Sequence, residues 1–302
     1  LTSLTQAPGQ PAGDQPPHII LLLADGLGYG EIGCYGQKTI ETPVIDRLAS
    51  EGIRFPQFYA GSPVCSPSRG VLMTGKSSPT ATIRGNSGHA DGRWDRVPLR
   101  PDEPALAELL KGRGYETVLV GKWHLDHPDQ PGTWAANRGF DHSLQEQWGA
   151  RIGGEEFMKD VHFINGREDT ATFHWQDWQS KDEFYTHHAF EFLDQVDPEK
   201  PLFLFMSYRA PHGNEKQIGN RDLYADRGWP EPERVHAAKI TLLDRQIGRL
   251  LGKLEAMGRL ENSLVIFTSD NGPHREGGNN PSFFQNSGPF RGIKRDLYEG
   301  GI

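Results

Sequence analysis

The stretch SPVCSPSRGVLMTG at positions 62–75 places a cysteine, Cys65, among prolines, serines and an arginine. The chain has only one other cysteine, Cys34, so its two cysteines do not indicate a disulfide framework. A single Cys34–Cys65 bridge is the lesser alternative. The position of Cys65 at the predicted start of a helix, rather than inside an apolar run, favours a chemical role.

Polar groups also follow the predicted strands. The runs 18–24, 54–59, 116–120, 202–206 and 264–268 predict strands of a mostly parallel sheet. The groups that come after these runs are Asp25, the CSPSR segment, Lys122 with His124, His212, and Asp270 with Asn271 and His274. Since the carboxyl ends of parallel strands share one edge of a sheet, we expect these groups to form one site.

Three of these groups offer oxygen ligands for a metal ion. Asp25, Asp270 and Asn271 are hard donors, which suit calcium or magnesium rather than zinc. Cys65 is the obvious candidate nucleophile, but a thiolate is a poor ligand for a hard cation. This mismatch suggests that Cys65 is not used as a cysteine.

Basic side chains make up the rest of the predicted site. Arg69, Lys122 and Lys294 carry fixed positive charges, whereas His124 and His212 can transfer protons near neutral pH. A divalent cation together with several basic groups fits a tetrahedral oxyanion, either sulfate or phosphate.

These motifs resemble those of a known family, the type I sulfatases of the alkaline phosphatase superfamily, and are similar to those of bacterial glycan sulfatases and arylsulfatase A-like enzymes. The resemblance is carried by LADGLGYGEIGCYG (23–36), CSPSRGVLMTG (65–75), GKWHL (121–125), SDNGPH (269–274) and RGIKRDLYEGG (291–301). It covers nearly the whole chain from His18 onward, in the order found in the family. The C-x-P-S-R sequence followed by x-x-L-x-T-G is its most specific element.

The resemblance implies that Cys65 is oxidised to Cα-formylglycine by a separate enzyme, either a formylglycine-generating enzyme or an anaerobic sulfatase-maturating enzyme. The hydrated aldehyde would attack the sulfur of a sulfate ester, most naturally one on a carbohydrate. Its second hydroxyl would then allow sulfate to be expelled and the aldehyde to be regenerated. Pro67 and Arg69 would belong to the signal for the modifying enzyme, and Arg69 would also hold the modified side chain.

By the same resemblance, calcium, in preference to magnesium, would be bound by Asp25, Asp270, Asn271 and the modified Cys65. Where the family usually has Asp-Asp, this chain has Asp25-Gly26, so one carboxylate is missing. Fewer negative oxygens weaken calcium binding. Three interpretations stay open: water or a nearby carboxylate fills the gap, the enzyme is impaired, or the chain is a pseudo-sulfatase. We expect a working site, because the other catalytic positions are intact.

The remaining implied roles concern the sulfate group and the protons. Lys122 and Lys294 would hold the sulfate oxygens. His212 would protonate the departing alcohol, and His124 would then accept a proton from the remaining hydroxyl. His274 would either contact the substrate or the sulfate, or merely orient Asn271.

The elements that must position these residues alternate between strands and helices. Helices are predicted over 42–52, 101–114 and about 234–257. The fold class is therefore α/β, with a mostly parallel central sheet and helices on both faces. Residues 137–190, rich in Trp, His, Asp and Phe, are expected to be an insertion of loops and short elements near the active face.

We divide the chain into a flexible linker at 1–17, rich in Pro, Gly and Gln, and a catalytic domain at 18–302. The abrupt end after YEGG and the family resemblance lead us to expect that a smaller C-terminal subdomain is absent from this chain. The linker-like start is typical of a processed protein, so we favour a periplasmic, secreted or surface location over the cytoplasm.

Composition argues against several other classes. The formal net charge of −8 is unfavourable for a broad nucleic-acid footprint. The longest apolar run, IILLLA at 19–24, is far too short to span a bilayer. Two rival functions stay open: a phosphonate monoester hydrolase or phosphodiesterase with the same nucleophile, and, because of Gly26, a sulfated-glycan binding protein without turnover.

Overall fold

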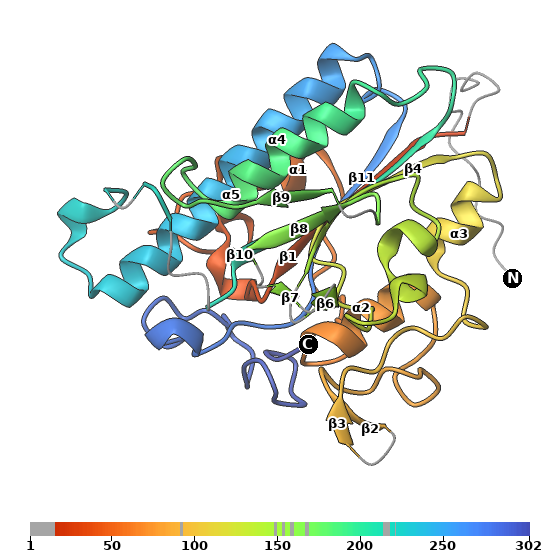
Figure 1. The fold of residues 1–302 in the computed structure, drawn as a ribbon. Coiled ribbons are helices and arrows are strands. Elements are labelled where there is room, and N and C mark those ends of the chain that lie inside the picture. The colour runs from red at the N-terminus through yellow and green to blue at the C-terminus, as the bar shows by residue number, and fades with distance from the viewer. Residues whose placement is uncertain are drawn as a thin grey trace, which may run out of the picture.

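A seven-stranded mixed sheet lies at the centre of the protein (Figure 1). The computed structural model describes residues 16–90, 93–147, 150–152, 155–157, 160–166, 169–213, 218–220 and 222–302. Residues 1–15 of the predicted linker lie outside this description. The strand order is β11-β1-β10-β4-β5-β8-β9.

The predicted parallel core of the sheet is confirmed. Strands β11, β1, β10, β4 and β5 pair in parallel, and β8 and β9 add an antiparallel edge. Their bounds are β1 His18–Asp25, β4 Glu116–Gly121, β5 His142–Glu146, β8 Val161–Ile164, β9 Thr170–Thr172, β10 Leu202–Pro211 and β11 Ser263–Ser269. Two small hairpins pair β2 (Gly88–Ala90) with β3 (Arg93–Asp95) and β6 (Ala150–Ile152) with β7 (Glu155–Phe157).

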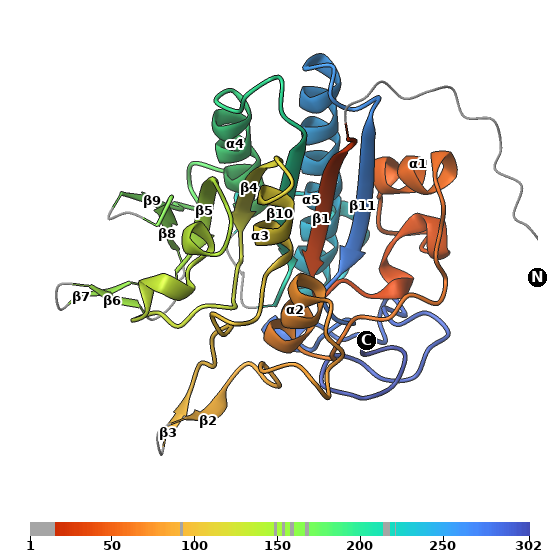
Figure 2. The same ribbon diagram turned by 90° about the vertical axis from the view of Figure 1, so that its right-hand side faces the viewer.

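Helices cover both faces of the sheet, as the α/β prediction requires (Figure 2). One face carries α1 (Pro43–Glu51), α4 (Lys181–Leu193) and α5 (Glu231–Ala256), and the other carries α2 (Cys65–Thr74) and α3 (Leu106–Lys111). Short 3-10 helices are η1 Tyr29–Glu31, η2 Gly33–Tyr35, η3 Pro131–Thr133, η4 Ala135–Asn137, η5 Ala225–Arg227 and η6 Glu276–Gly278. Among the described residues, no helix combines the length and apolar character needed to cross a bilayer.

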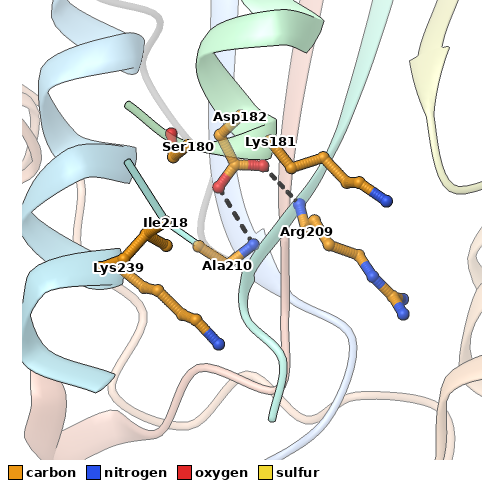
Figure 3. Close-up of a pocket in the computed structure, with 7 residues that line it drawn as sticks. All are labelled: Ser180, Lys181, Asp182, Arg209, Ala210, Ile218 and Lys239. Atoms are coloured by element: carbon orange, nitrogen blue, oxygen red, sulfur yellow. Dashed lines mark hydrogen bonds between the residues drawn. The ribbon is translucent and has the colours of Figure 1, made fainter. Parts of the chain in front are cut away.

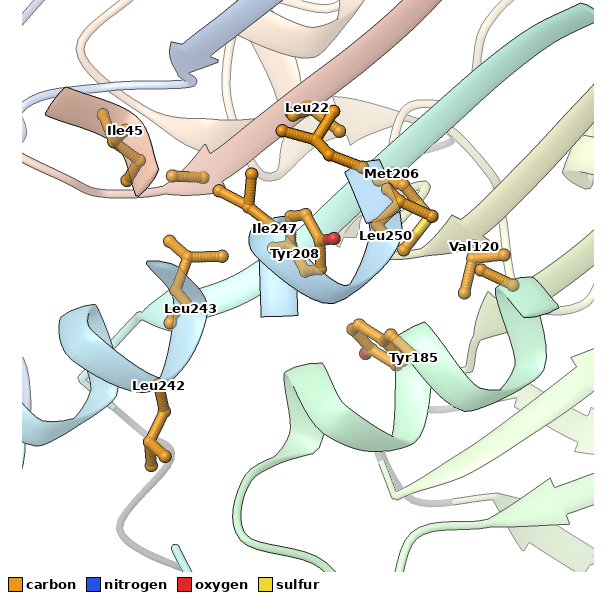
Figure 4. Close-up of a cluster of buried hydrophobic side chains, with 14 of the residues drawn as sticks. Leu22, Ile45, Val120, Tyr185, Met206, Tyr208, Leu242, Leu243, Ile247 and Leu250 are labelled. Atoms are coloured by element: carbon orange, nitrogen blue, oxygen red, sulfur yellow. The ribbon is translucent and has the colours of Figure 1, made fainter. Parts of the chain in front are cut away.

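Alternating side chains of β1 supply both halves of the hydrophobic core. Leu22 packs in the cluster formed with Ile247 and Leu250 of α5 (Figure 4), whereas Leu23 belongs to the opposite cluster with Met73 of α2. Each fully buried leucine contributes about 1.5–3 kcal/mol to folding. Because both faces are covered, β1 is apolar along most of its length and delivers its first carboxylate, Asp25, only at its end.

One predicted strand is wrong, and one predicted helix begins later than expected. Residues 54–59 are not a strand but an irregular segment, in which Phe55 and Phe58 are 63% and 61% exposed. Pro56 interrupts this segment and lacks the N–H that a sheet interior requires. The helix predicted over 101–114 begins only at Leu106, because Pro104 disfavours helical backbone in the residue before it.

The segment 137–190 is not simply an insertion near the active face, because it forms part of the central sheet. It supplies β5, β8 and β9 to the central sheet, and its last residues form the first part of α4. Its composition, rich in Trp, His, Asp and Phe, led us to expect an insertion, and these three strands have only three to five residues each, too few to give a clear periodic pattern. Within this segment, residues 148–149, 153–154, 158–159 and 167–168 lie outside the described structure.

Candidate active site

Cys65 is the first residue of α2 and lies beside the carboxyl ends of β1 and β11. Val64 has extended backbone angles, φ −144° and ψ 156°, so the helix begins directly at Cys65. The side chain is 1% exposed, and its Sγ lies 3.5 Å from Asp25 Oδ1 and 3.5 Å from Asn271 Oδ1. The pairing of β1 with β11 thus brings two of the predicted oxygen ligands to the predicted nucleophile.

The surroundings of Cys65 disfavour an ordinary cysteine nucleophile. Burial and then the negative charge of Asp25 raise the pKa of the Cys65 thiol to about 11, although Lys122 and Lys294 act in the opposite direction. A cysteine that attacks as a thiolate needs a pKa below its usual value. At neutral pH the unmodified side chain is therefore an unreactive thiol.

Asp25 is completely buried among basic groups. Its Oδ2 accepts hydrogen bonds from Lys122 Nζ at 2.6 Å and from Arg209 Nη1 at 3.0 Å. Burial opposes ionisation of this carboxyl, but the positive charges of Lys122 and Arg209 hold its pKa well below the usual value. Asp25 is therefore a permanent carboxylate, with Oδ1 directed to Cys65 and Oδ2 engaged by cations.

Arg69 of α2 holds the helix against the end of β11 through an ion pair with Asp270, the residue that follows the strand. Its guanidinium donates to Asp270 Oδ2 from Nε at 2.9 Å and from Nη2 at 2.7 Å. Nη1 donates to the carbonyl oxygen of Lys122 at 2.7 Å and to Ser207 Oγ at 2.5 Å. Because these acceptors occupy all three nitrogens, Arg69 fixes the positions of the site residues rather than reaching out for a substrate.

His212 and Lys294 also lie close to Cys65. Ligand atoms of Asp25, Cys65 and His212 all lie within 4.8 Å of one another. Lys294, which is 4% exposed, contacts Glu276 Oε2 at 3.1 Å. Burial opposes the charge of Lys294, but the nearby anionic groups, among them Asp25, raise its pKa above the usual value.

His124 follows β4 in a strained position. Its φ of 59° lies in the left-handed region, which residues other than glycine rarely adopt. Its carbonyl oxygen accepts the hydroxyl of Ser66 on α2 at 2.5 Å, while its buried Nδ1 has no hydrogen-bond partner among the described residues. Burial and the charge of Lys122 hold the pKa of the imidazole well below its usual value, so the ring is neutral.

His274 occupies the space beside Gly26, the position at which a carboxylate was expected. A Cβ added to Gly26 would lie 2.9 Å from His274 Cδ2 and 3.3 Å from Asn271 Nδ2, and the φ of Gly26 is +76°. His274 is held there, because its Nε2 donates to the carbonyl oxygen of Pro211 at 3.2 Å. Glu31 does not fill the gap, since its Oε2 accepts the N–H of Gly28 at 2.5 Å within a separate buried cluster.

Sequence reasoning missed Arg209, which is 6% exposed and touches Asp25 directly. Its backbone is fixed by Asp182 at the start of α4, whose two oxygens accept the N–H groups of Arg209 at 2.6 Å and Ala210 at 3.0 Å (Figure 3). Arg209 lies near the carboxyl end of β10, three residues before His212, so its place at the strand end, rather than alternation, could have indicated that it reaches the site.

Beside the start of α2, Asn86 contacts the residue next to Cys65. Its Oδ1 accepts the N–H of Ser66 at 3.0 Å, next to Cys65. Arg84 is exposed and donates to the carbonyl oxygen of Pro79 instead. Cys34 and Cys65 are both free thiols.

The donor atoms fit a hard divalent cation. Asp25 Oδ1 and Asn271 Oδ1 converge on Cys65, and Asp270 adds a second carboxylate, whose Oδ1 accepts the N–H of Gly26 at 3.0 Å. Asp25, Cys65 and His212 resemble a zinc set in composition, but zinc binds cysteine as a thiolate and the raised pKa of Cys65 opposes this. The carboxylate and amide oxygens suit calcium or magnesium better.

Four buried basic groups lie around Cys65. Arg69, Lys122, Arg209 and Lys294 are 1%, 5%, 6% and 4% exposed. The neighbouring acids include Asp25, Asp270, the partly buried Glu276, and Glu146, which lies 3.7 Å from Arg209. Lys122 and Lys294 both act to lower the pKa of the buried Cys65 thiol, and convergent positive charges at this point suit a substrate with a negatively charged group.

Comparisons with known proteins all point to the same family. The sulfatase family model matches residues 17–302. N-acetylgalactosamine-6-sulfatase of Sus scrofa is 32% identical over 318 residues, which covers 95% of this chain and 56% of that protein. An arylsulfatase of Hemicentrotus pulcherrimus is 30% identical over 304 residues, covering 94% of this chain and 52% of that protein. The chain thus spans about half the length of these curated relatives.

Solved structures show the same likeness. Ps i-CgsB in complex with k-i-k-neocarrahexaose has a TM-score of 0.78 and 29% identity, covering 95% of this chain and 64% of that one. The PsFucS1 sulfatase from Pseudoalteromonas sp. has a TM-score of 0.71 and 27% identity, covering 95% and 60%. The phosphonate monoester hydrolase of Agrobacterium radiobacter, with a TM-score of 0.58 and 20% identity, shows likeness of fold alone.

Proposed function

Since the chain belongs to the sulfatase family, we propose that it hydrolyses sulfate esters of carbohydrates, with the modified side chain of residue 65 as nucleophile. The observation that carries the proposal is the position of Cys65 between the oxygens of Asp25 and Asn271, within a group of buried cations. The substrate class is supported by the relatives. The pig protein is named an N-acetylgalactosamine-6-sulfatase, and Ps i-CgsB was crystallised with a neocarrahexaose.

The proposal includes one modification and one metal ion. A separate modifying enzyme would convert Cys65 to Cα-formylglycine, and Asp25, Asp270, Asn271 and the modified residue would hold calcium in preference to magnesium. When present, the hydrated aldehyde supplies the hydroxyl that attacks sulfur, and the cation supplies positive charge that polarises the sulfate group. Sulfated glycans are extracellular polymers, so an exported location fits this activity.

The chain's own residues would bind the ester and move the protons. Lys122 and Lys294, whose charges both act on the Cys65 thiol, would hold the sulfate oxygens and stabilise their growing charge. Burial and Arg209 hold the pKa of His212 well below its usual value, whereas the negative charge of a bound sulfate favours the imidazolium. His212 would therefore be charged only with substrate in place, when it is needed to protonate the departing alcohol. The neutral His124 would accept the proton of the later step.

The activity is tested with protein from a host that contains the modifying enzyme. We expect hydrolysis of 4-nitrophenyl sulfate and of sulfated galactose or hexosamine saccharides. Faster hydrolysis of the phosphate diester with the same leaving group would instead indicate a phosphodiesterase. Binding of sulfated saccharides without turnover, despite full conversion of Cys65, would show that the protein is a non-catalytic glycan-binding relative.

The arrangement of Gly26 and His274 predicts how calcium affinity responds to mutation. Restoring a carboxylate with Gly26→Asp alone is expected to leave calcium binding no tighter, because the new side chain meets His274 and must adopt a strained φ. The double variant Gly26→Asp/His274→Gly frees this space. It is expected to bind calcium about tenfold more tightly or better, since an added carboxylate ligand raises affinity.

Isothermal titration calorimetry with calcium on the folded proteins measures these affinities. His274→Gly alone is the control, and we expect no gain in its affinity. If Gly26→Asp alone binds calcium as tightly as the double variant, His274 does not block the position of the missing ligand.

A further inference from the structure

Glu276 lies at the edge of the site, in a turn that packs directly against the residue after His212. A Cβ added to Gly213 would lie 2.3 Å from the carbonyl carbon of Glu276, and one added to Gly277 would lie 2.3 Å from the carbonyl oxygen of Gly213. Gly277 also has a φ of +77°. Neither glycine can carry a side chain without moving the backbone, so the turn is fixed at a short distance from His212.

The carboxylate of Glu276 contacts basic side chains through both of its oxygens. Oε2 lies 3.1 Å from Lys294 Nζ and 3.4 Å from His212 Nε2, and Oε1 accepts a hydrogen bond from Arg295 Nη2 at 2.7 Å. The Glu276 side chain is 19% exposed. Burial alone would raise the pKa of Glu276, but Lys294 and Arg295 hold it below the usual value, so the group is a carboxylate at neutral pH.

A negative charge at this place works against the binding of an anionic ester. It partly neutralises Lys294, one of the two groups proposed to hold the sulfate oxygens, and it repels a sulfate that approaches the same ammonium group. If the only role of this residue were to tighten binding of the sulfate ester, we would expect a neutral side chain here. The geometry is different: one oxygen, Oε2, touches both of the groups proposed to act on the ester from this side, His212 and Lys294.

We propose that Glu276 is a positioning residue that holds His212 and Lys294 at a fixed separation on the side of the departing alcohol. This inference rests on the proposed sulfatase function. His212 lies at the end of β10 and Lys294 in an irregular segment near the end of the chain, so the sheet itself does not set their distance. Arg295 donates a hydrogen bond to the other oxygen of Glu276, Oε1. This contact restrains rotation of the carboxylate, so that Oε2 stays directed at His212 and Lys294.

The proposal predicts an effect that depends on the leaving group. A sugar alcohol is a poor leaving group and depends on an acid aligned with the departing oxygen, whereas 4-nitrophenolate departs with little help. If Glu276 only supported the fold, its loss would lower the rates for both kinds of ester by the same factor. If it aligns His212, the sugar ester suffers far more.

The test compares Glu276→Gln with wild-type protein on a sulfated monosaccharide and on 4-nitrophenyl sulfate. We expect kcat/KM to fall about 100-fold for the sugar ester and less than about tenfold for the aryl ester, mainly through kcat for the sugar. The matched control is Glu183→Gln, a similarly buried glutamate, 17% exposed, that pairs with Arg249 at 3.1 Å away from the site. This control should change neither value by more than about twofold.

Two further variants keep the test decisive if Glu276→Gln does not fold. Glu276→Asp keeps the charge but shortens the side chain, and it should show the same preference for the aryl ester. In a His212→Ala background, Glu276→Gln should cause little further loss on the sugar ester. Equal losses on both esters, or an undiminished further loss without His212, would overturn the proposal. Absence of any hydrolysis by wild-type protein would instead contradict the proposed function itself.

Discussion

Replacing Cys65 with alanine is expected to abolish hydrolysis of sulfate esters while leaving the fold intact. The side chain is 1% exposed and lies between Asp25 and Asn271, so no other nucleophile of the described residues takes its place. Removing a nucleophile typically lowers kcat by about 10⁴-fold or more. Loss of one buried sulfur should cost only about 1 kcal/mol of stability. Initial rates and a circular-dichroism melting curve measure the two effects.

The matched control is Cys34→Ala. Cys34 is the only other cysteine of the chain, lies in η2 and is half-buried against the larger hydrophobic cluster. It should retain turnover within about twofold of wild type, since surface-near substitutions away from the site have small effects. Turnover by Cys65→Ala protein that approaches the rate of Cys34→Ala protein would exclude residue 65 as the nucleophile.

Replacing Arg69 with alanine is expected to lower the free energy of unfolding by about 3–5 kcal/mol, the usual cost of removing one partner from a buried ion pair. The reason is that Asp270 Oδ2 would lose two charge-assisted hydrogen bonds while it stays buried. The carbonyl oxygen of Lys122 and Ser207 Oγ would each lose one hydrogen bond from Arg69 as well, although Ser207 Oγ still donates to that carbonyl oxygen at 2.6 Å. Urea unfolding monitored by circular dichroism gives the difference.

The control for this variant is Arg249→Ala. Arg249 is 47% exposed and donates to Glu183 at 3.1 Å on the surface, so its loss should cost less than about 1 kcal/mol. If the two arginine variants are destabilised equally, the ion pair between Arg69 and Asp270 does not hold α2 against the end of β11.

The starts of β1, β4, β10 and β11 were predicted to within one residue, but β10 extends to Pro211, beyond the predicted 202–206, and β5 was not predicted as a strand. In β1 and β10, continuous apolar runs end where polar groups begin, because both faces of these strands are covered by helices. Residues 54–59 offered a similar composition without a partner strand, and Pro56 keeps them irregular. The edge strands β8 and β9 were missed, since strands of four and three residues give no measurable alternation.

The positions of site residues that directly follow strands could be predicted. Contacts between residues of two irregular loops could not. The position of Asp25 and Asn271 beside Cys65 follows from parallel pairing, which brings strand ends together. The contact of Gly26 with His274, and those of Glu276, depend on the paths of irregular loops. No periodicity in the sequence records these paths, so only the structure shows that an imidazole fills the space of the missing carboxylate.

The most direct test of the account is the mass of the peptide that contains residue 65, measured alongside the turnover of the same sample. Protein should be prepared with and without a formylglycine-generating enzyme in the host. We predict that specific activity rises in proportion to the fraction of peptide in which the CH2SH group has become an aldehyde. Full activity in a sample whose peptide carries only unmodified cysteine would contradict the account.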